Sequence, residues 1–194
     1  MPLRAYNGDE RQRPMKEHLT TDLHLNHAKL VTKGFRPEGY EEMITSDWRT
    51  QVQDDDVVYC LGDVAMGKEG EAHERIKTLP GRKILIRGNH DKQKDAWYLS
   101  HGWDEIHDSL RLNRTVNGRH TRVILTHVPI AVDNSWDLNI HGHFHNDSHR
   151  AKTEEMLAIY SNKHRLLSIE CVDYKMVPFQ EFLEGKVIQV GLPV

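Results

Sequence analysis

Two apolar runs constrain the fold of this chain more than any other feature. Residues 56–63 (DVVYCLGD) and 83–91 (KILIRGNHD) are almost continuously apolar, and each run closes on Gly and polar residues. Such runs are typical of strands buried on both faces of a sheet. Apolar side chains at helical spacing precede them, at 40–52 and 72–79. With the more polar run 18–22 as the first strand, the sequence predicts a β-α-β-α-β unit.

The second half of the chain has a different pattern. Residues 109–116 and 119–127 flank Asn117-Gly118, which is a strong signal for a two-residue hairpin turn. Two further strands and one helix are predicted at 138–143, 166–174 and 153–160. This inventory indicates an α/β domain that contains either one mixed sheet or two stacked sheets.

Length and composition predict a single domain without a membrane span. The chain has 194 residues; we expect 1–15 to form a mobile arm and 16–194 to form one domain. No stretch approaches the roughly 18–20 apolar residues that a membrane helix needs, and the N-terminus lacks the apolar core of a signal peptide. Cys60 and Cys171 lie in apolar runs, which predicts buried free thiols. A cytoplasmic protein is therefore expected.

Histidine is unusually frequent, whereas the overall charge is modest. The net charge of −3 offers no global basic field for nucleic acid. Half of the 14 histidines fall in four short segments: His24, His27, His90, His127, His141, His143 and His145.

Polar residues gather where each predicted strand ends, and their chemistry is that of a metal site. Because ligands collect at the carboxyl ends of strands in α/β sheets, these segments are expected to converge. Carboxylate and imidazole donors without thiolate suit Mn, Fe, Zn or Ni, and not a structural zinc site. The candidates are too many for one tetrahedral ion, so the sequence predicts a two-metal centre: Asp22, His24, Asp63, Asn89, His127, His143 and His145.

Taken in order, these segments resemble a known signature. The series Asp22-x-His24, Gly62-Asp63, Gly88-Asn89-His90-Asp91, His127 and Gly142-His143-x-His145 resembles the five motifs of the calcineurin-like metallophosphoesterase superfamily. It is similar to the small single-domain phosphodiesterases of bacterial and phage type. The resemblance implies two stacked mixed β-sheets flanked by helices, in a four-layer α/β/β/α sandwich. It also implies that the chain could form a homodimer.

The resemblance further implies a role for each residue. One ion is held by Asp22, His24, Asp63 and His145, and the other by Asp63, Asn89, His127 and His143. In this scheme Asp63 bridges the two ions. His90 is the acid that protonates the leaving oxygen, and Asp91 supports it. Two cations about 3.5–4 Å apart lower the pKa of a bridging water and clamp the attacking and leaving oxygens.

The expected function is that of a hydrolase on phosphate esters with two divalent ions as cofactors, of which manganese is favoured. A phosphodiesterase is the first hypothesis, with a cyclic nucleotide or an oligonucleotide end as substrate. A phosphomonoesterase is the alternative, and a nuclease or a non-catalytic interaction scaffold ranks lower. Arg87 is the candidate phosphate contact. His27 and His141 could either support the ligands or contact substrate.

Overall fold

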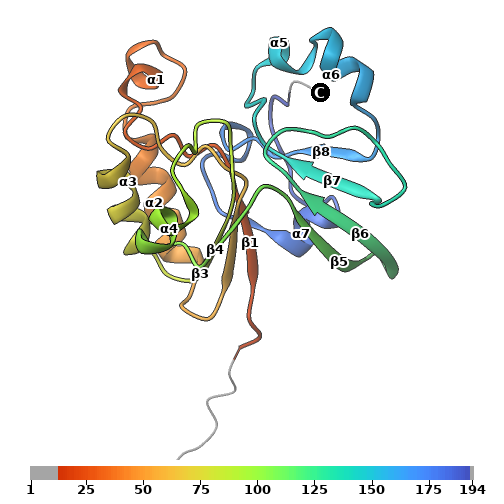
Figure 1. Ribbon diagram of the computed structural model, residues 1–194, viewed down its shortest axis with the longest axis horizontal. Coiled ribbons are helices and arrows are strands. Elements are labelled where there is room, and N and C mark those ends of the chain that lie inside the picture. The colour runs from red at the N-terminus through yellow and green to blue at the C-terminus, as the bar shows by residue number, and fades with distance from the viewer. Residues whose placement is uncertain (1–12, 193–194) are drawn as a thin grey trace, which may run out of the picture.

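The computed structural model describes residues 13–192, which fold into two β-sheets flanked by helices (Figure 1). The strands are β1 (Glu17–Thr20), β2 (Val57–Cys60), β3 (Arg82–Ile86), β4 (Glu105–His107), β5 (Leu110–Val116), β6 (Arg119–Leu125), β7 (Leu138–His141), β8 (His164–Leu166) and β9 (Val177–Pro178). The helices are α1 (Ala28–Thr32), α2 (Tyr40–Gln51), α3 (Glu69–Lys77), α4 (Asp95–Ser100), α5 (Ser148–Ala151), α6 (Glu154–Ile159) and α7 (Phe179–Leu183), with a 3₁₀ turn at Glu170–Val172.

Both sheets are mixed. The first has the order β4-β3-β2-β1-β9, in which β1 to β4 run parallel and β9 pairs antiparallel with β1. The second has the order β5-β6-β7-β8, in which β5 and β6 form an antiparallel hairpin and β6, β7 and β8 run parallel. The predicted α/β class, with two mixed sheets and flanking helices, is confirmed.

The first sheet is buried on both faces, as its apolar runs predict. Along β2, Val58 and Cys60 join a core that includes Trp48 of α2. The alternate residues Val57 and Tyr59 join a second core that also contains residues of β6 and β7. Figure 1 shows α2, α3 and α4 on the side of the first sheet that faces away from the second. Each large apolar side chain buried in these cores contributes about 1.5–3 kcal/mol.

The hairpin forms where the sequence places it. Asn117 and Gly118 have φ of 48° and 77°, so both central residues take the left-handed conformation that a type I′ turn requires. The predicted helices at 40–52, 72–79 and 153–160 correspond to α2, α3 and α6.

One predicted strand is wrong. The run 166–174 was expected to be extended, but β8 ends at Leu166 and the chain continues into the 3₁₀ turn. Its apolar side chains are nevertheless buried, Leu167 between the sheets and Ile169 against the helices. An apolar run shows that a segment is buried, but it does not show whether the segment pairs as a strand. The short elements α1, α4, α5 and β4 were not predicted.

The remaining expectations concern the termini, cysteines and membrane. Residues 1–12 of the predicted arm lie outside the described residues. Arg13 donates a hydrogen bond to the buried carboxylate of Asp56 at 2.8 Å, so this last part of the arm lies against the domain. Cys60 and Cys171 are free and buried, as predicted. Across residues 13–192, no helix has both the length and the apolar character needed to cross a membrane.

Candidate metal centre

All seven predicted ligands come together at the carboxyl ends of strands from both sheets. The first sheet contributes the loops after β1, β2 and β3, and the second contributes those after β6 and β7. Each strand stops two to four residues before its ligand, so the ligands lie in loops and can turn toward one another. The convergence predicted from the strand ends is therefore present.

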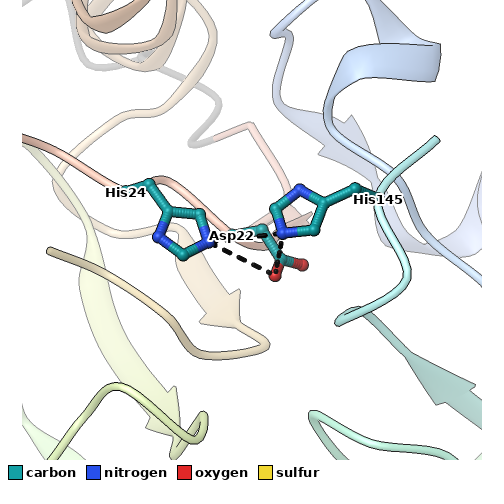
Figure 2. A group of neighbouring side chains, drawn as sticks. All are labelled: Asp22, His24 and His145. Atoms are coloured by element: carbon teal, nitrogen blue, oxygen red, sulfur yellow. Dashed lines mark hydrogen bonds and ion pairs between the residues drawn. The ribbon is translucent and has the colours of Figure 1, made fainter. Parts of the chain in front are cut away.

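The first cluster consists of Asp22, His24 and His145 (Figure 2). Nε2 of His145 lies 3.3 Å from Oδ1 of Asp22 and 3.3 Å from Nε2 of His24. Nε2 of His24 lies 3.9 Å from the same Asp22 oxygen. Asp22 Oδ1 is buried and has no hydrogen-bond partner among the described residues. A buried acceptor left in this way is costly unless a proton or cation meets it.

The second cluster consists of Asp63, His127 and His143, with Asn89 beside them. Nε2 of His127 lies 3.1 Å from Nδ1 of His143, 3.1 Å from Oδ1 of Asn89 and 3.3 Å from Oδ2 of Asp63. The other ring nitrogen of His127 donates to the carbonyl of Leu61 at 2.7 Å. That bond keeps a proton on Nδ1, so Nε2 is the nitrogen that can offer a lone pair to a cation once its own proton is displaced.

Asp63, a member of the second cluster, also lies close to the first. Its Oδ2 atom lies 3.3 Å from Nε2 of His127 and 3.7 Å from Nε2 of His24. Oδ1 accepts a hydrogen bond from the backbone N–H of His90 at 2.8 Å, which fixes the carboxylate. One oxygen is thus within reach of two groups of nitrogen donors.

The electrostatics of the clusters fit cation binding. Burial lowers the pKa of His24 to about 3 and that of His143 to about 4, so both rings are neutral and able to ligate. Burial also acts to lower the pKa of His127, but the hydrogen bond to Asp63 and the charges of Asp22 and Asp63 outweigh it and raise the value to about 9. A cation among these carboxylates would take the place of that proton.

The backbone at the ligands is strained. Among residues 13–192, nine non-glycine residues have positive φ, and five of them are predicted ligands: Asp22, His24, Asp63, His143 and His145. Conformations of this kind cost about 1–3 kcal/mol each and concentrate at functional sites. Strain at five ligands is therefore a second observation, independent of distance, that supports a functional centre.

Two glycines leave room for the carboxylates. A Cβ atom on Gly88 would lie 2.1 Å from Oδ1 of Asp63, and one on Gly142 would lie 2.4 Å from Oδ2 of Asp22. Glycine is required at both positions because the backbone itself approaches a ligand.

Asp91 and His90, both predicted as catalytic, have different environments. Asp91 is buried and its carboxylate accepts hydrogen bonds from the backbone N–H groups of Asp63, Gly88 and Val64. It therefore holds the loops of two strands together and lies out of reach of a ligand in the cavity. The side chain of His90 is 34% exposed, with Nε2 3.9 Å from Oδ2 of Asp63.

Two residues of the site were missed from the sequence. Glu170 accepts from Nδ1 of His145 at 2.9 Å and from Nη2 of Arg36 at 2.5 Å. Arg36 also donates to the carbonyls of Asp22 and Leu23, at 2.7 and 2.9 Å. This pair fixes the orientation of one ligand and the backbone of another. Glu170 is the one charged residue in the apolar run 166–172, which is a signal for a partnered buried carboxylate; Arg36 gave no comparable signal.

The three predicted substrate contacts do not share one location. His141 is fully buried, and its ring nitrogens bond to the Gly142 carbonyl and the Tyr160 hydroxyl, which leaves a supporting role. Arg87 forms an ion pair with Asp95 and lies over the ring of Tyr98, away from the cavity described next. Only His27 lines that cavity.

A cavity of about 350 Å³ opens beside the first cluster. His24, His145 and His90 line this cavity. The lining also includes basic and apolar side chains: Lys29, Leu30, Lys33, Phe35, Met66 and Arg150. The first cluster is therefore accessible to a small molecule through this cavity.

Fold and site together define an α/β protein of two mixed sheets whose facing strand ends carry two adjoining His/Asp clusters able to hold metal ions. No family model matches the chain. The chain belongs to the family of the Gene 66 proteins of mycobacteriophages. It is 32% identical to that of phage D29 over 65% of this chain and 76% of the phage protein, and 31% identical to that of phage L5 over 65% and 75%.

Two further relatives cover nearly the whole chain. The uncharacterized protein MJ1445 of Methanocaldococcus jannaschii is 28% identical over 90% of this chain and 95% of its own length. The crystal structure of AQ665 from Aquifex aeolicus, a protein of unknown function, has a TM-score of 0.64 at 27% identity and covers 87% of this chain and 98% of that one. The AQ665 structure supports the fold, and neither name states an activity.

Proposed function

We propose that the protein is a phosphoesterase that uses two divalent metal ions and prefers phosphate diesters. The observation that carries this proposal is the position of Oδ2 of Asp63, 3.3 Å from the second cluster and 3.7 Å from the first. A carboxylate between two sets of imidazoles is suited to hold two cations close together, and paired cations of this kind are the centre of two-metal hydrolases. We also propose, on the same ground, membership of the calcineurin-like metallophosphoesterases and their four-layer sandwich.

The donor sets follow from the two clusters. Asp22, His24, Asp63 and His145 would hold one ion, and Asp63, Asn89, His127 and His143 would hold the other. Two such ions, with Mn favoured over Fe, Zn or Ni, would supply positive charge that polarises a phosphate ester and lowers the pKa of a nearby water.

The side chains of the protein supply the remaining functions. His90 lines the cavity with Nε2 3.9 Å from Oδ2 of Asp63, where its imidazole can protonate a leaving oxygen. Its backbone N–H also holds the Asp63 carboxylate in place. Arg36 and Glu170 orient His145, and Asp91 holds the loops that carry Asp63 and Asn89.

The direct test compares bis(p-nitrophenyl) phosphate with p-nitrophenyl phosphate, using protein loaded with Mn and protein treated with EDTA. We expect hydrolysis that depends on metal and is faster for the diester. Faster hydrolysis of the monoester would replace the diester preference with a phosphomonoesterase function. No hydrolysis of either ester by protein that binds two Mn would contradict the enzyme proposal and favour an interaction scaffold.

His90→Ala separates catalysis from metal binding. Loss of a positioned proton donor is expected to lower kcat by about 10²–10⁴-fold while two metal ions remain bound, as measured by elemental analysis. His120→Ala is the matched control, because His120 is an exposed histidine near the start of β6 that belongs to neither cluster and does not line the cavity. Wild-type kcat in His90→Ala would show that another group protonates the leaving oxygen.

A further inference from the structure

The cavity beside the first cluster is lined by two lysine side chains that have no carboxylate partner in the described part of the chain. Of the two carboxylates that line it, Glu170 is paired with Arg36, and Asp147 lies 3.8 Å from Arg150. Lys29 and Lys33 line the same cavity, and within residues 13–192 neither ammonium group has a carboxylate within 4.0 Å.

The two lysine side chains repel each other. They lie four residues apart, at α1 and at the residue that ends it, so they are neighbours on one side of a single turn. Like charges at this spacing destabilise a helix by a few tenths of a kcal/mol. Leu30 and Val31 pack against the core around Trp48 and hold this helix in place, which leaves both lysine side chains exposed at the cavity. An anion between them would offset their repulsion.

An apolar wall adjoins the lysines. Leu30, Phe35 and Met66 line the cavity, and Phe35 is 66% exposed although it is aromatic. An exposed aromatic face beside cationic side chains is suited to a flat ring that is attached to an anionic group. The cavity volume of about 350 Å³ lies near the lower end of the range for small-molecule pockets, so it holds one nucleotide-sized group and not several.

We propose that Lys29 and Lys33 bind a second phosphate of the substrate, one that is not cleaved, while the wall at Phe35 contacts an aromatic base. This inference rests on the phosphoesterase function proposed above and narrows its substrate class. The preferred substrate is then a nucleotide ester with at least two phosphates, such as the terminal nucleotide of a short oligonucleotide. A cyclic mononucleotide, which has a single phosphate, leaves the lysines unpaired.

Two chromogenic esters that differ by one phosphate test this proposal. Thymidine 5′-(p-nitrophenyl phosphate) carries only the scissile phosphate, and its 3′-phosphorylated counterpart carries a second one with the same leaving group. For the Mn-loaded protein we expect kcat/KM at least tenfold higher with the 3′-phosphorylated ester. That ratio should fall as KCl is raised, because salt screens charges exposed at the cavity mouth.

The variant Lys29→Gln/Lys33→Gln is expected to bring the ratio of the two kcat/KM values below about two. Lys77→Gln removes an exposed lysine from α3, outside the cavity, and should leave the ratio at its wild-type value. A wild-type ratio near one, or an unchanged ratio in the double variant, would overturn the proposal.

Equilibrium binding keeps the test independent of catalysis. By calorimetry with EDTA-treated protein, thymidine 3′,5′-bisphosphate should bind at least tenfold more tightly than thymidine 5′-monophosphate, and the double variant should lose this difference. If neither ester is hydrolysed, the enzyme proposal fails while the binding measurement still decides the role of the lysines. Equal affinity for the two nucleotides would contradict the proposal that the lysines bind a second phosphate.

Discussion

Asp63 shows how much a single residue contributes to this site. Its Oδ1 atom accepts from the backbone of His90, and its Oδ2 atom lies within 3.7 Å of nitrogens from both clusters. Its own backbone N–H donates to Asp91 at 2.8 Å, and its φ of 54° is in the left-handed region. Position, orientation and backbone conformation of this residue all depend on contacts distant in sequence.

Substitutions of Asp63 and of Asn89 should have unequal effects on metal binding. Asp63→Asn removes the charge shared by both clusters, so we expect it to lose high-affinity binding of both ions. Asn89→Ala removes a donor from one cluster only, so one ion should remain tightly bound. Calorimetric titration with Mn measures the stoichiometry, and two wild-type sites in Asp63→Asn would disprove the shared role.

His73, outside the site, should make stability depend on pH. It is 1% exposed, accepts from Nε1 of Trp103 at 2.9 Å, and burial lowers its pKa to about 4. Between about pH 6.5 and 4 the unfolded chain binds a proton at this residue and the folded chain does not, so stability is lost as pH falls through this window. The loss attributable to His73 is up to about 3 kcal/mol.

The measurement is the free energy of unfolding in urea at pH 7 and pH 4.5. His73→Gln keeps an acceptor for Trp103 but cannot titrate, so its loss of stability between these pH values should be smaller than that of the wild type. His120→Gln is the matched control at an exposed histidine and should follow the wild type. Parallel pH profiles for wild type and His73→Gln would contradict the assignment.

At the scale of elements, each strand ends before its ligand because the backbone must turn there. β3 is followed by Gly88, whose backbone lies against the Asp63 carboxylate that follows β2, so neighbouring strand ends are in contact at one glycine. Apolar pattern and Asn-Gly chemistry were sufficient to predict β2, β3 and the hairpin. The apolar pattern did not predict the structure of 166–174, because this segment buries its side chains in both cores without forming a strand.

Two glycine substitutions should have opposite effects. In Gly88→Ala the added methyl would lie 2.1 Å from Oδ1 of Asp63, so we expect loss of Mn binding and of stability. In Gly70→Ala, within α3, the methyl meets nothing within 4 Å, and alanine should raise stability by about 0.5–1 kcal/mol. Thermal unfolding with and without Mn compares the two. Unchanged metal affinity in Gly88→Ala would refute the close approach.

At the scale of the whole molecule, the clusters join the two sheets. Asp22, Asp63 and Asn89 follow strands of the first sheet, whereas His127, His143 and His145 follow strands of the second. Ions held between them would link elements that otherwise meet through the apolar core between the sheets. Folding and metal binding are therefore expected to be coupled.

Metal should accordingly raise the unfolding temperature. At a free concentration 100 times its Kd, one ion stabilises the folded state by about 2.7 kcal/mol, which corresponds to a Tm increase of about 5–10 °C for a chain of this size. Calorimetric scans with Mn and with EDTA measure the difference. Asp63→Asn should show little of it, and a wild-type Tm that is insensitive to EDTA would contradict metal binding between the sheets.

The sequence by itself determined which segments are buried, where the hairpin turns and which side chains follow the strands, because these are local properties of pattern and residue chemistry. The tertiary structure decided how the ends of two sheets face each other, and with this the sharing of Asp63 between both clusters. It also decided that Arg36 and Glu170 support His145, that Asp91 and His141 are buried supports, and that Arg87 lies apart from the cavity. Contacts of this kind join residues up to 134 positions apart, so only the packing of the sheets creates them.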